Sequence, residues 1–348
     1  MSSTPTNPSS RAAPGARNLI TDVPGLAVGQ AQDAAARTGV TVILPEDRAV
    51  AACDVRGGGP GTRETDALVP ENLVEAIDAI VLSGGSVYGL AAADGVAAYL
   101  GARGRGYGLV AGVPPSPVVP AAILYDIANG GDRTWGEDPP YRRLGREAVA
   151  SVGPDFALGT AGAGYGAMAG SLKGGTGSAS IIAADGIAVG ALVCVNSYGS
   201  VVAPGGRSFW AAPFEIGAEF GGLGAAGLCA DPDDWGLAKA DPHTRLGLRP
   251  NTTIACVATD VVLTPAQAKR VAIMAQDGLA RAIRPIHAPF DGDVVFALST
   301  GKRPLEGGDF TLARIGALAA DTLARAVARG VFEATPWPDA EVRCWRDL

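Results

Sequence analysis

Short apolar runs alternate with amphipathic helical segments along the chain, and this alternation constrains the fold more than any other feature of the sequence. Strands are predicted over the six apolar runs 39–44, 49–55, 79–82, 187–195, 252–258 and 293–298. Helices are predicted over 86–100, 265–283 and 310–328. Because a sheet and an amphipathic helix each need a partner for one apolar face, the chain is expected to fold as sheets covered by helices.

Two of these helices carry recognisable capping residues. Thr264 is followed by Pro265 and, three positions on, by Gln267, which together form a capping box with proline at the first helical position. Gly330 stands just beyond the helix predicted over 310–328, where a left-handed C-terminal residue is expected. Side-chain chemistry and periodicity therefore agree on where these helices begin and end.

Composition and charge favour a soluble α/β enzyme. Of the 348 residues, 47% are apolar and only 18% are charged, while glycine (49) and proline (25) supply many turns. The net charge of −7 and the lack of a basic cluster argue against nucleic-acid binding. No uncharged run is apolar enough to predict a membrane span, and the polar residues 1–18 lack the apolar centre of a signal peptide. We therefore expect a cytoplasmic protein with a disordered tail over 1–18 and one domain over 19–348.

Several common catalytic and metal-binding motifs are missing from the sequence. The five cysteines are scattered without a C-x-x-C pair, so neither a zinc site nor a disulfide framework is predicted. Only two histidines, His243 and His287, are present, which leaves little for a Ser-His-Asp triad. The sequence also has no nucleophile elbow and no phosphate-binding P-loop.

Three glycine-rich runs, 56–64, 83–89 and 161–170, are candidate binding loops. The last departs from the dinucleotide-binding pattern, because Ala167 stands where the third glycine is required and no strong strand precedes it. Gly84 and Gly85 are different, since they follow a predicted strand and precede a predicted helix. Their N–H groups form either an oxyanion site at a helix N-terminus or a plain strand-to-helix turn.

Single polar residues stand at the ends of other apolar runs. Lys173 lies among small residues, Asn196 follows the strand over 187–195, and Tyr125 ends a further apolar run. Each one, taken alone, is most simply a structural hydrogen-bonding group. Asp291 and Asp293 lead into the last predicted strand and allow two interpretations. Within the strand they share one face and can orient an acid–base group; before the strand they form a solvated Asp-Gly turn.

The strand over 252–258 begins with two hydroxyl residues directly after Asn251. The long polar stretch before it, 231–250, is typical of an exposed loop that a protease can cut. Asn and Thr are also ordinary residues at the entry to a strand, so this junction does not identify a function by itself.

Taken in order, these residues resemble the DmpA-like family of self-processing aminopeptidases and amidases, from about Leu19 to Ala334. The resemblance rests on Arg56-Gly57-Gly58, Ser83-Gly84-Gly85-Ser86, Tyr125-Asp126, Ala161-Gly162-Ala163-Gly164 with Lys173-Gly174-Gly175, Asn196, Asn251-Thr252-Thr253 and Asp291-Gly292-Asp293. It implies a four-layer α/β/β/α sandwich of the N-terminal-nucleophile hydrolase type. It also implies self-cleavage between Asn251 and Thr252, and a homo-oligomer, expected to be a tetramer, of the resulting α chain (1–251) and β chain (252–348).

The resemblance further implies a role for each site residue. Thr252 is the nucleophile, and its freed α-amine, with a reference pKa of about 7.7–8.0, is the general base. Asn196 and the backbone of Gly84 and Gly85 would form the oxyanion hole. Lys173 would hold Thr252 or tune its amine, and Asp291 and Asp293 would orient Thr252 and promote cleavage. Tyr125 would line the acyl site. No metal or organic cofactor is implied. Substrates would be short peptides, β-peptides, amino-acid amides or ω-amino-acid oligomers.

The nucleophile and the acidic pair indicate one branch of the family. The aminopeptidases of the family have a serine nucleophile and a Ser-x-Glu pair, whereas this chain has Thr252 and an Asp-x-Asp pair. In both respects the chain is more similar to the nylon-oligomer hydrolases. Two alternatives remain at this point: acyl transfer to an amine, as in the ornithine acetyltransferases, and a non-catalytic nucleotide-binding protein built on the glycine-rich loops.

Overall fold

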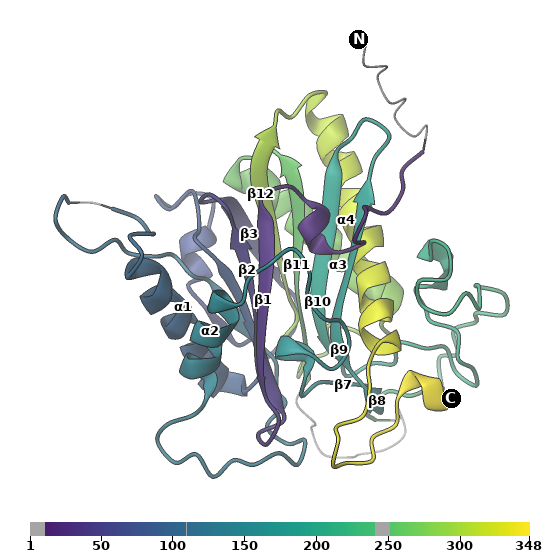
Figure 1. Ribbon diagram of the computed structural model, residues 1–348. Helices are drawn as coiled ribbons and strands as arrows, with labels where there is room; N and C mark the ends of the chain where they lie inside the picture. The colour runs from purple at the N-terminus through teal and green to yellow at the C-terminus, as the bar shows by residue number, and fades with distance from the viewer. Residues whose placement is uncertain (1–10, 109, 241–250) are drawn as a thin grey trace, which may run out of the picture.

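Two β-sheets lie face to face at the centre of the molecule, and helices cover their outer faces (Figure 1). The computed structural model describes residues 11–108, 110–240 and 251–348. Its strands are β1 (Leu26–Asp33), β2 (Thr38–Pro45), β3 (Val50–Val55), β4 (Thr62–Arg63), β5 (Ile80–Ser83), β6 (Ala121–Ile123), β7 (Met168–Ala169), β8 (Leu172–Lys173), β9 (Gly175–Ile182), β10 (Ala188–Asn196), β11 (Thr252–Val261) and β12 (Val294–Arg303). Its α-helices are α1 (Ala91–Gly101), α2 (Tyr141–Ala150), α3 (Pro265–Ala282) and α4 (Gly308–Phe332).

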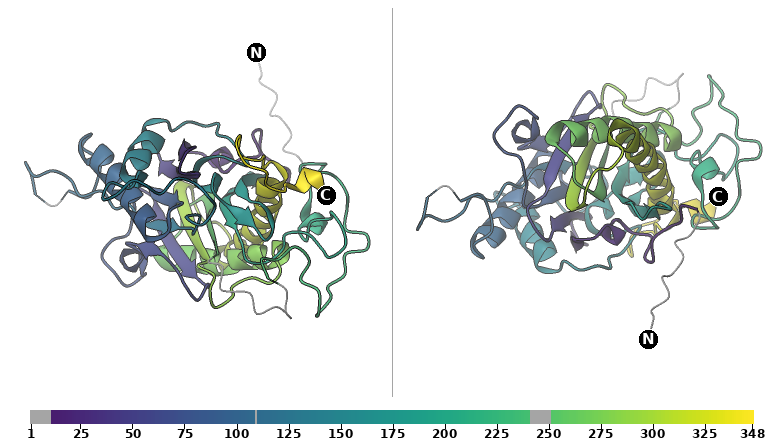
Figure 2. Two further views of the ribbon diagram at one scale, coloured as in Figure 1. Left: turned by 90° about the horizontal axis from the view of Figure 1, so that it is seen from below. Right: turned by 90° about the horizontal axis from the view of Figure 1, so that it is seen from above.

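The first sheet has the strand order β1-β2-β5-β6-β4, and α1 and α2 pack on its outer face. Val42 of β2 and Val81 of β5 contribute to this apolar layer from the sheet, while Val96 of α1 and Leu144 of α2 contribute from the helices. Both helices therefore use their apolar faces to shield the same sheet from water. Figure 2 shows these two helices on the side of the molecule opposite to α3 and α4.

The second sheet has the strand order β3-β12-β11-β10-β9, and α3 and α4 cover its outer face. β11 lies in the middle, antiparallel to β10 and parallel to β12. The helix α3 begins with the expected capping box, in which Thr264 Oγ1 accepts from the Gln267 N–H at 3.3 Å and Gln267 Oε1 accepts from the Thr264 N–H at 2.9 Å. This cap satisfies N–H groups that a helix N-terminus leaves without partners.

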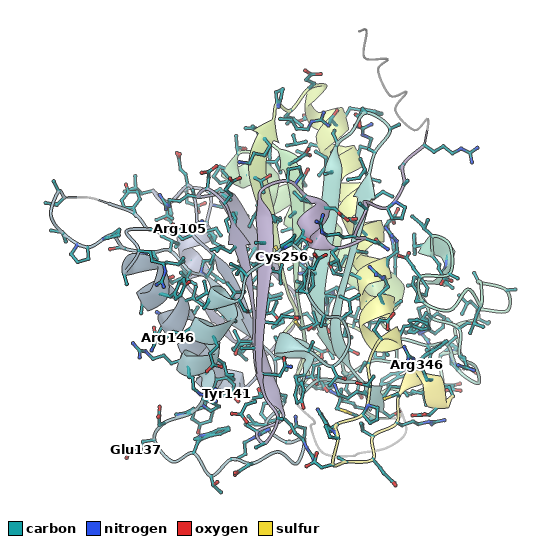
Figure 3. The ribbon with its side chains drawn as sticks, in the orientation of Figure 1. Arg105, Glu137, Tyr141, Arg146, Cys256 and Arg346 are labelled. Carbon is teal, nitrogen blue, oxygen red and sulfur yellow. The ribbon has the colours of Figure 1, made fainter. Side chains whose placement is uncertain are left out.

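A third apolar layer fills the space between the two sheets. Ile43 and Leu82 point into it from the first sheet, and Leu192, Cys256 and Phe296 point into it from the second. Cys256 lies near the centre of the molecule in Figure 3. The order of the layers is therefore helix, sheet, sheet, helix, and the expected α/β/β/α sandwich is confirmed.

Two boundary predictions are wrong. The segment predicted as a helix over 86–100 starts with a 3₁₀ turn, Ser86–Leu90, and only then becomes α1. Gly330 does not follow the last helix but lies inside α4, where a Cβ would stand 2.9 Å from the backbone nitrogen of Gly177. Glycine is therefore present at this position because α4 approaches β9 backbone to backbone.

The expected disorder over 1–18 is also wrong for residues 11–18, while residues 1–10 lie outside the described residues. Ala13 and Ile182 exchange two backbone hydrogen bonds of 3.0 and 2.7 Å, so this segment runs along the edge of β9. The Asn18 amide donates to Glu219 at 2.6 Å, and Arg325 of α4 donates both to Glu219 and to Asn18. A buried ion pair of this kind needs such extra hydrogen bonds to offset its desolvation.

None of the helices within the described ranges is long and apolar enough to span a bilayer. The same part of the chain contains no group of three or more His, Cys, Asp or Glu side chains placed to hold a metal ion.

Candidate active site

Thr252 is the first residue of β11, the central strand of the second sheet. It is opposite Asn196, the last residue of β10, in the antiparallel register. The side chains of Asn251 and Thr252 are almost completely buried. The Thr252 hydroxyl donates a hydrogen bond to the carbonyl oxygen of Asn251. The two expected junction residues are thus held in the interior, with the hydroxyl beside the carbonyl group that precedes it.

The loop before β12 brings both aspartates to this junction. A Cβ on Gly292 would lie 2.8 Å from Thr252 Oγ1, which is too close for a side chain. Glycine at this position therefore allows the loop to approach the hydroxyl. Asp293 Oδ1 accepts a hydrogen bond of 2.7 Å from the backbone N–H of Thr253. Both aspartates are fully buried, and β12 begins only at Val294. Neither interpretation of the acidic pair was right: the pair lies before the strand, but its carboxyl groups are not solvated.

Asp291 is the ionisable group of this loop whose environment is most unusual. One of its carboxyl oxygens, Oδ2, accepts from the Ala288 N–H at 3.0 Å. The other, Oδ1, is buried without a hydrogen-bond partner among the described residues. Burial, and then the negative charge of Asp293, raise the pKa of Asp291 to about 7. A carboxyl group with this pKa can give or take a proton near neutral pH.

Asn196 is fixed by contacts at both ends of its amide. Its Oδ1 accepts from the Met168 N–H at 3.0 Å, and its Nδ2 donates to the Tyr125 carbonyl oxygen at 3.0 Å. Lys239 also donates to Asn196 Oδ1, at 3.4 Å. A side-chain amide has two N–H donors, so one remains for a further acceptor. The half-buried Tyr125 is therefore joined to the junction through Asn196.

Lys173 is fully buried at the end of β8. Its ammonium donates to the carbonyl oxygens of Gly164, Ala167 and Gly174 at 3.3, 3.1 and 2.7 Å. Burial lowers the pKa of Lys173 to about 7. In the described part of the chain no hydrogen bond joins its ammonium to Thr252. The ammonium instead stabilises the turn that ends at Ala167. The N–H of the following residue, Met168, donates to Asn196.

The N–H groups of Gly84 and Gly85 are already used by the protein. Gly84 donates to the Gly39 carbonyl oxygen at 2.9 Å, and Gly85 donates to Asp126 Oδ1 at 2.7 Å. Thr38 donates to the other carboxyl oxygen of Asp126 at 2.7 Å. The expectation that Gly84 and Gly85 supply an oxyanion hole is therefore corrected, because the Gly39 carbonyl oxygen accepts from Gly84 and the buried Asp126 carboxyl group accepts from Gly85.

The other glycine-rich runs serve close backbone packing. A Cβ on Gly57 would lie 2.3 Å from the backbone nitrogen of Asp293, and one on Gly164 would lie 2.1 Å from that of Thr176. Gly57 thus allows the loop 56–59 to support the loop that carries the two aspartates. These contacts give the glycines a structural purpose that needs no nucleotide.

Two surface cavities of about 680 Å³ each lie away from this junction. One is between α1 and α2, where Tyr99, Arg103 and Arg146 are among its lining residues, and the other lies along residues 336–343. Neither is lined by Thr252 or by a residue that contacts it. Among the described residues, the candidate site is therefore outlined by its buried polar contacts.

Comparison with known proteins identifies the family. The profile of peptidase family S58 matches residues 18–343. The chain belongs to peptidase family S58. A protein of Mycobacterium tuberculosis described as an uncharacterized aminopeptidase is 44% identical over 352 residues, which cover 95% of this chain and 98% of that protein. The 6-aminohexanoate-oligomer endohydrolase of Kocuria sp. is 30% identical over 298 residues, covering 82% of this chain and 76% of that enzyme. This S58 member is thus a hydrolase of amide or peptide bonds.

Solved structures agree on the fold of this S58 peptidase. A Burkholderia sp. beta-aminopeptidase superposes with a TM-score of 0.69 at 24% identity, covering 95% of this chain and 90% of the other. The L-aminopeptidase D-Ala-esterase/amidase of Ochrobactrum anthropi gives a TM-score of 0.68 at 21% identity, covering 97% and 93%. The latter enzyme has a variant of the Ntn hydrolase fold. These structures agree with the fold, while the match to family S58 and the named hydrolase relatives confirm the resemblance to the DmpA-like family. The alternative of a non-catalytic nucleotide-binding protein is therefore wrong.

Two residues of this region had no role predicted from the sequence. His287 contacts Asp293 directly, and Asp126 occupies the turn at Gly85. His287 is one of only two histidines in the sequence, and it lies six positions before Asp293. Its rarity and its closeness to the acidic pair are the signal from which its role could be predicted. Asp126 follows Tyr125 directly, but nothing in the local sequence predicts its hydrogen bond to the turn at Gly85, which follows a different strand.

Proposed function

We propose that this S58 peptidase cleaves its own chain between Asn251 and Thr252 and then hydrolyses linear amides with Thr252 as the nucleophile. The observation that carries the proposal is the contact between the Thr252 hydroxyl and the Asn251 carbonyl group, inside a buried polar cluster. Before the hydroxyl can attack the preceding carbonyl carbon, it needs a group that accepts its proton. It also needs a hydrogen-bond donor, such as an amide N–H, for the negative charge that develops on the carbonyl oxygen. Asn196 is paired with Thr252, Asp293 accepts from the N–H of Thr253, and Asp291 precedes Gly292, the loop residue that lies close to the hydroxyl.

Self-cleavage would begin with attack of Thr252 Oγ1 on the carbonyl carbon of Asn251. The hydroxyl proton passes to an acceptor in the cluster, for which ionised Asp291 is the candidate because its pKa is raised to about 7. The amide nitrogen of Thr252 takes up a proton as its bond to Asn251 breaks, which leaves an ester at Oγ1. Water then hydrolyses the ester and leaves a carboxylate on Asn251 and a free α-amine on Thr252.

The freed amine supplies the base that the enzyme needs in turnover. An α-amine has a pKa of about 7.7–8.0, so a useful fraction is neutral at pH 7 and can accept the proton of its own hydroxyl. Oγ1 attacks the substrate carbonyl carbon, the proton passes to the leaving amine, and water releases the acyl group from the ester. The remaining N–H of Asn196 is the candidate donor to the oxyanion.

The names of the relatives suggest the substrate class. They include an uncharacterized aminopeptidase and an endohydrolase of 6-aminohexanoate oligomers. We propose short peptides, β-peptides, amino-acid amides and ω-amino-acid oligomers as substrates. Hydrolysis is preferred over acyl transfer because the relatives are named as hydrolases. Efficient transfer from acetylornithine to glutamate, without amide hydrolysis, would reverse that preference.

The two chains made by cleavage are expected to stay together as one domain. β11 would belong to the new β chain, yet it pairs along its length with β10 of the α chain. On the other side it pairs with β12 of its own chain, which in turn pairs with β3 of the α chain. The sheet thus joins both products. A homo-oligomer of such pairs remains a proposal based on the family resemblance.

The test is the intact mass of freshly purified protein, compared with Thr252→Ala and Thr252→Ser. We expect the wild type to give two fragments, one ending at Asn251 and one beginning at Thr252. The serine variant keeps a hydroxyl and should also cleave, whereas the alanine variant should remain whole and inactive. A wild type that stays uncleaved while hydrolysing amides, or an alanine variant cut at the same bond, would refute the role of Thr252.

A further inference from the structure

His287 makes two hydrogen bonds to one oxygen of Asp293. Its ring nitrogen Nδ1 lies 2.8 Å from Asp293 Oδ2, and its backbone N–H donates to the same oxygen at 3.1 Å. The Asp293 side chain is fully buried, and the imidazole is 23% exposed. The Nδ1 edge of the imidazole therefore meets the buried carboxyl group, while part of the ring remains accessible.

The backbone at His287 adopts a conformation that most residues avoid. Its φ angle is +58°, in the left-handed region. Among residues other than glycine, Asn, Asp and His tolerate this region best. Non-glycine residues in such a conformation are concentrated at sites where a particular side-chain direction is required. Here the conformation allows the backbone N–H and the ring nitrogen of one residue to point at the same carboxyl oxygen.

A continuous series of contacts leads from His287 to the proposed nucleophile. His287 holds Asp293 Oδ2, and Asp293 Oδ1 accepts from the N–H of Thr253 at 2.7 Å. Thr253 is joined covalently to Thr252. We propose that His287 is a positioning residue, which fixes the Asp293 carboxylate so that this carboxylate sets the backbone of the nucleophile. The inference rests on the proposed function, because it assumes that Thr252 is the reacting residue.

The contacts do not support His287 as the base that acts on Thr252 itself. The Thr252 hydroxyl donates to Asn251, and the loop residue Gly292 lies close to it. The imidazole Nδ1 is instead bonded to a carboxyl oxygen of Asp293. A charge-assisted contact of this kind holds its partner in place more firmly than a neutral one. His287 would therefore act on the rate of reaction through Asp293.

The loop has other anchors, so His287 can be replaced without removing its support. Phe290 packs edge-on against Tyr198 at 4.6 Å between ring centroids, and the Asp291 carbonyl oxygen accepts from the Gly59 N–H at 2.7 Å. The variants are chosen to keep the backbone conformation. His287→Asn tolerates a positive φ and can place an amide donor near the position of Nδ1, whereas His287→Gly tolerates it and removes the donor.

The experiment measures self-cleavage by intact mass over time and, on cleaved protein, kcat and KM for an amino-acid p-nitroanilide. We expect His287→Gly to cleave itself about tenfold more slowly than wild type and to have a kcat about tenfold lower with little change in KM. His287→Asn should stay within about threefold of wild type. Thermal unfolding of each variant identifies any loss of folding, and His287→Gln, whose amide is displaced by one methylene, serves as a third variant if the glycine variant is unfolded.

A double-mutant cycle with Asp293→Asn decides whether His287 acts through Asp293. If it does, adding His287→Gly to Asp293→Asn should slow the reaction by less than twofold further. Wild-type rates in the glycine variant, equal losses in the glycine and asparagine variants, or additive losses in the cycle would each overturn this inference while leaving Thr252 as the nucleophile. A wild type that does not cleave between Asn251 and Thr252 would instead overturn the proposed function, and this inference with it.

Discussion

Asp291→Asn is expected to make the folded protein more stable at alkaline pH while impairing its chemistry. The carboxyl group is fully buried, and its pKa is raised to about 7 from an ordinary value of 3.8. Between these two pH values the folded chain holds a proton that the unfolded chain has lost. The free energy of unfolding therefore falls as pH rises from about 4 to about 7 and stays low above that range. An asparagine at this position is neutral at every pH and has no such loss.

The size of the effect follows from the difference between the two pKa values. At 1.36 kcal/mol for each pH unit, a rise from 3.8 to about 7 corresponds to about 4 kcal/mol at most. Relaxation around the ionised group reduces this figure, so we expect Asp291→Asn to gain about 2–4 kcal/mol at pH 8 and little at pH 4. The amide can preserve an acceptor for the Ala288 N–H, which Asp291 Oδ2 provides in the wild type.

The assay is urea unfolding at pH 4, 6 and 8, with every variant made in a Thr252→Ala chain so that none is cleaved. Other buried carboxyl groups titrate too, such as Asp126, whose burial raises its pKa to about 6, but those that do not interact with Asp291 contribute equally to parent and variant. Asp155→Asn is the control, because its side chain is 77% exposed and its removal should change stability little at any pH. Equal pH dependence in the parent and Asp291→Asn, or a variant that is less stable at pH 8, would refute the reasoning.

Three further predictions concern single contacts. Asn196→Ala should lower kcat for amide hydrolysis by about 10²–10³-fold. The folded variant should also unfold at a lower temperature, because the Met168 N–H and the Tyr125 carbonyl group lose their partner. A loss of kcat under threefold would remove Asn196 from the oxyanion site. Thr264→Ala should lower the free energy of unfolding in urea by about 1 kcal/mol without changing kcat, because it removes the cap of α3; unchanged stability would argue against that cap. Gly330→Ala should destabilise the protein by about 1–3 kcal/mol, because the new methyl group would collide with the backbone of Gly177. Alanine has the higher helix propensity, so a more stable variant would contradict that contact.

The strands that could be predicted from the sequence are those with bulky apolar residues. Each of the six predicted runs overlaps one strand, namely β2, β3, β5, β10, β11 or β12. β9 was missed because its sequence, GTGSASII, is rich in small and polar residues, although nearly all of it is buried. Its burial comes from the close approach of α4, where a Cβ on Gly177 would lie 1.9 Å from the Ala326 carbonyl oxygen. Local hydrophobicity cannot report such a contact, because the partner lies far along the chain.

The site was predictable to the extent that its residues lie at strand ends. Asn196 and Thr252 end and begin two strands, and antiparallel pairing brings them opposite each other. The role of His287 depends on a left-handed backbone in a loop, which periodicity does not reveal. The oxyanion prediction at Gly85 failed for a related reason. A glycine-rich turn exposes N–H groups locally, and only the tertiary structure shows that Asp126 accepts from one of them.

The position of the proposed cleavage explains how the chain can change its chemistry without changing its fold. Thr252 is the first residue of β11, so cutting before it leaves the pairing of this strand with β10 and β12 intact. What the cut would add is an α-amine at the end of a strand whose next N–H is already held by Asp293. An amine placed in this way has little freedom left to lose when it acts as a base, which is how pre-organisation lowers a reaction barrier. The contacts that hold the precursor junction would therefore also orient the nucleophile of the mature enzyme. Variants such as His287→Gly should then slow self-cleavage and turnover together.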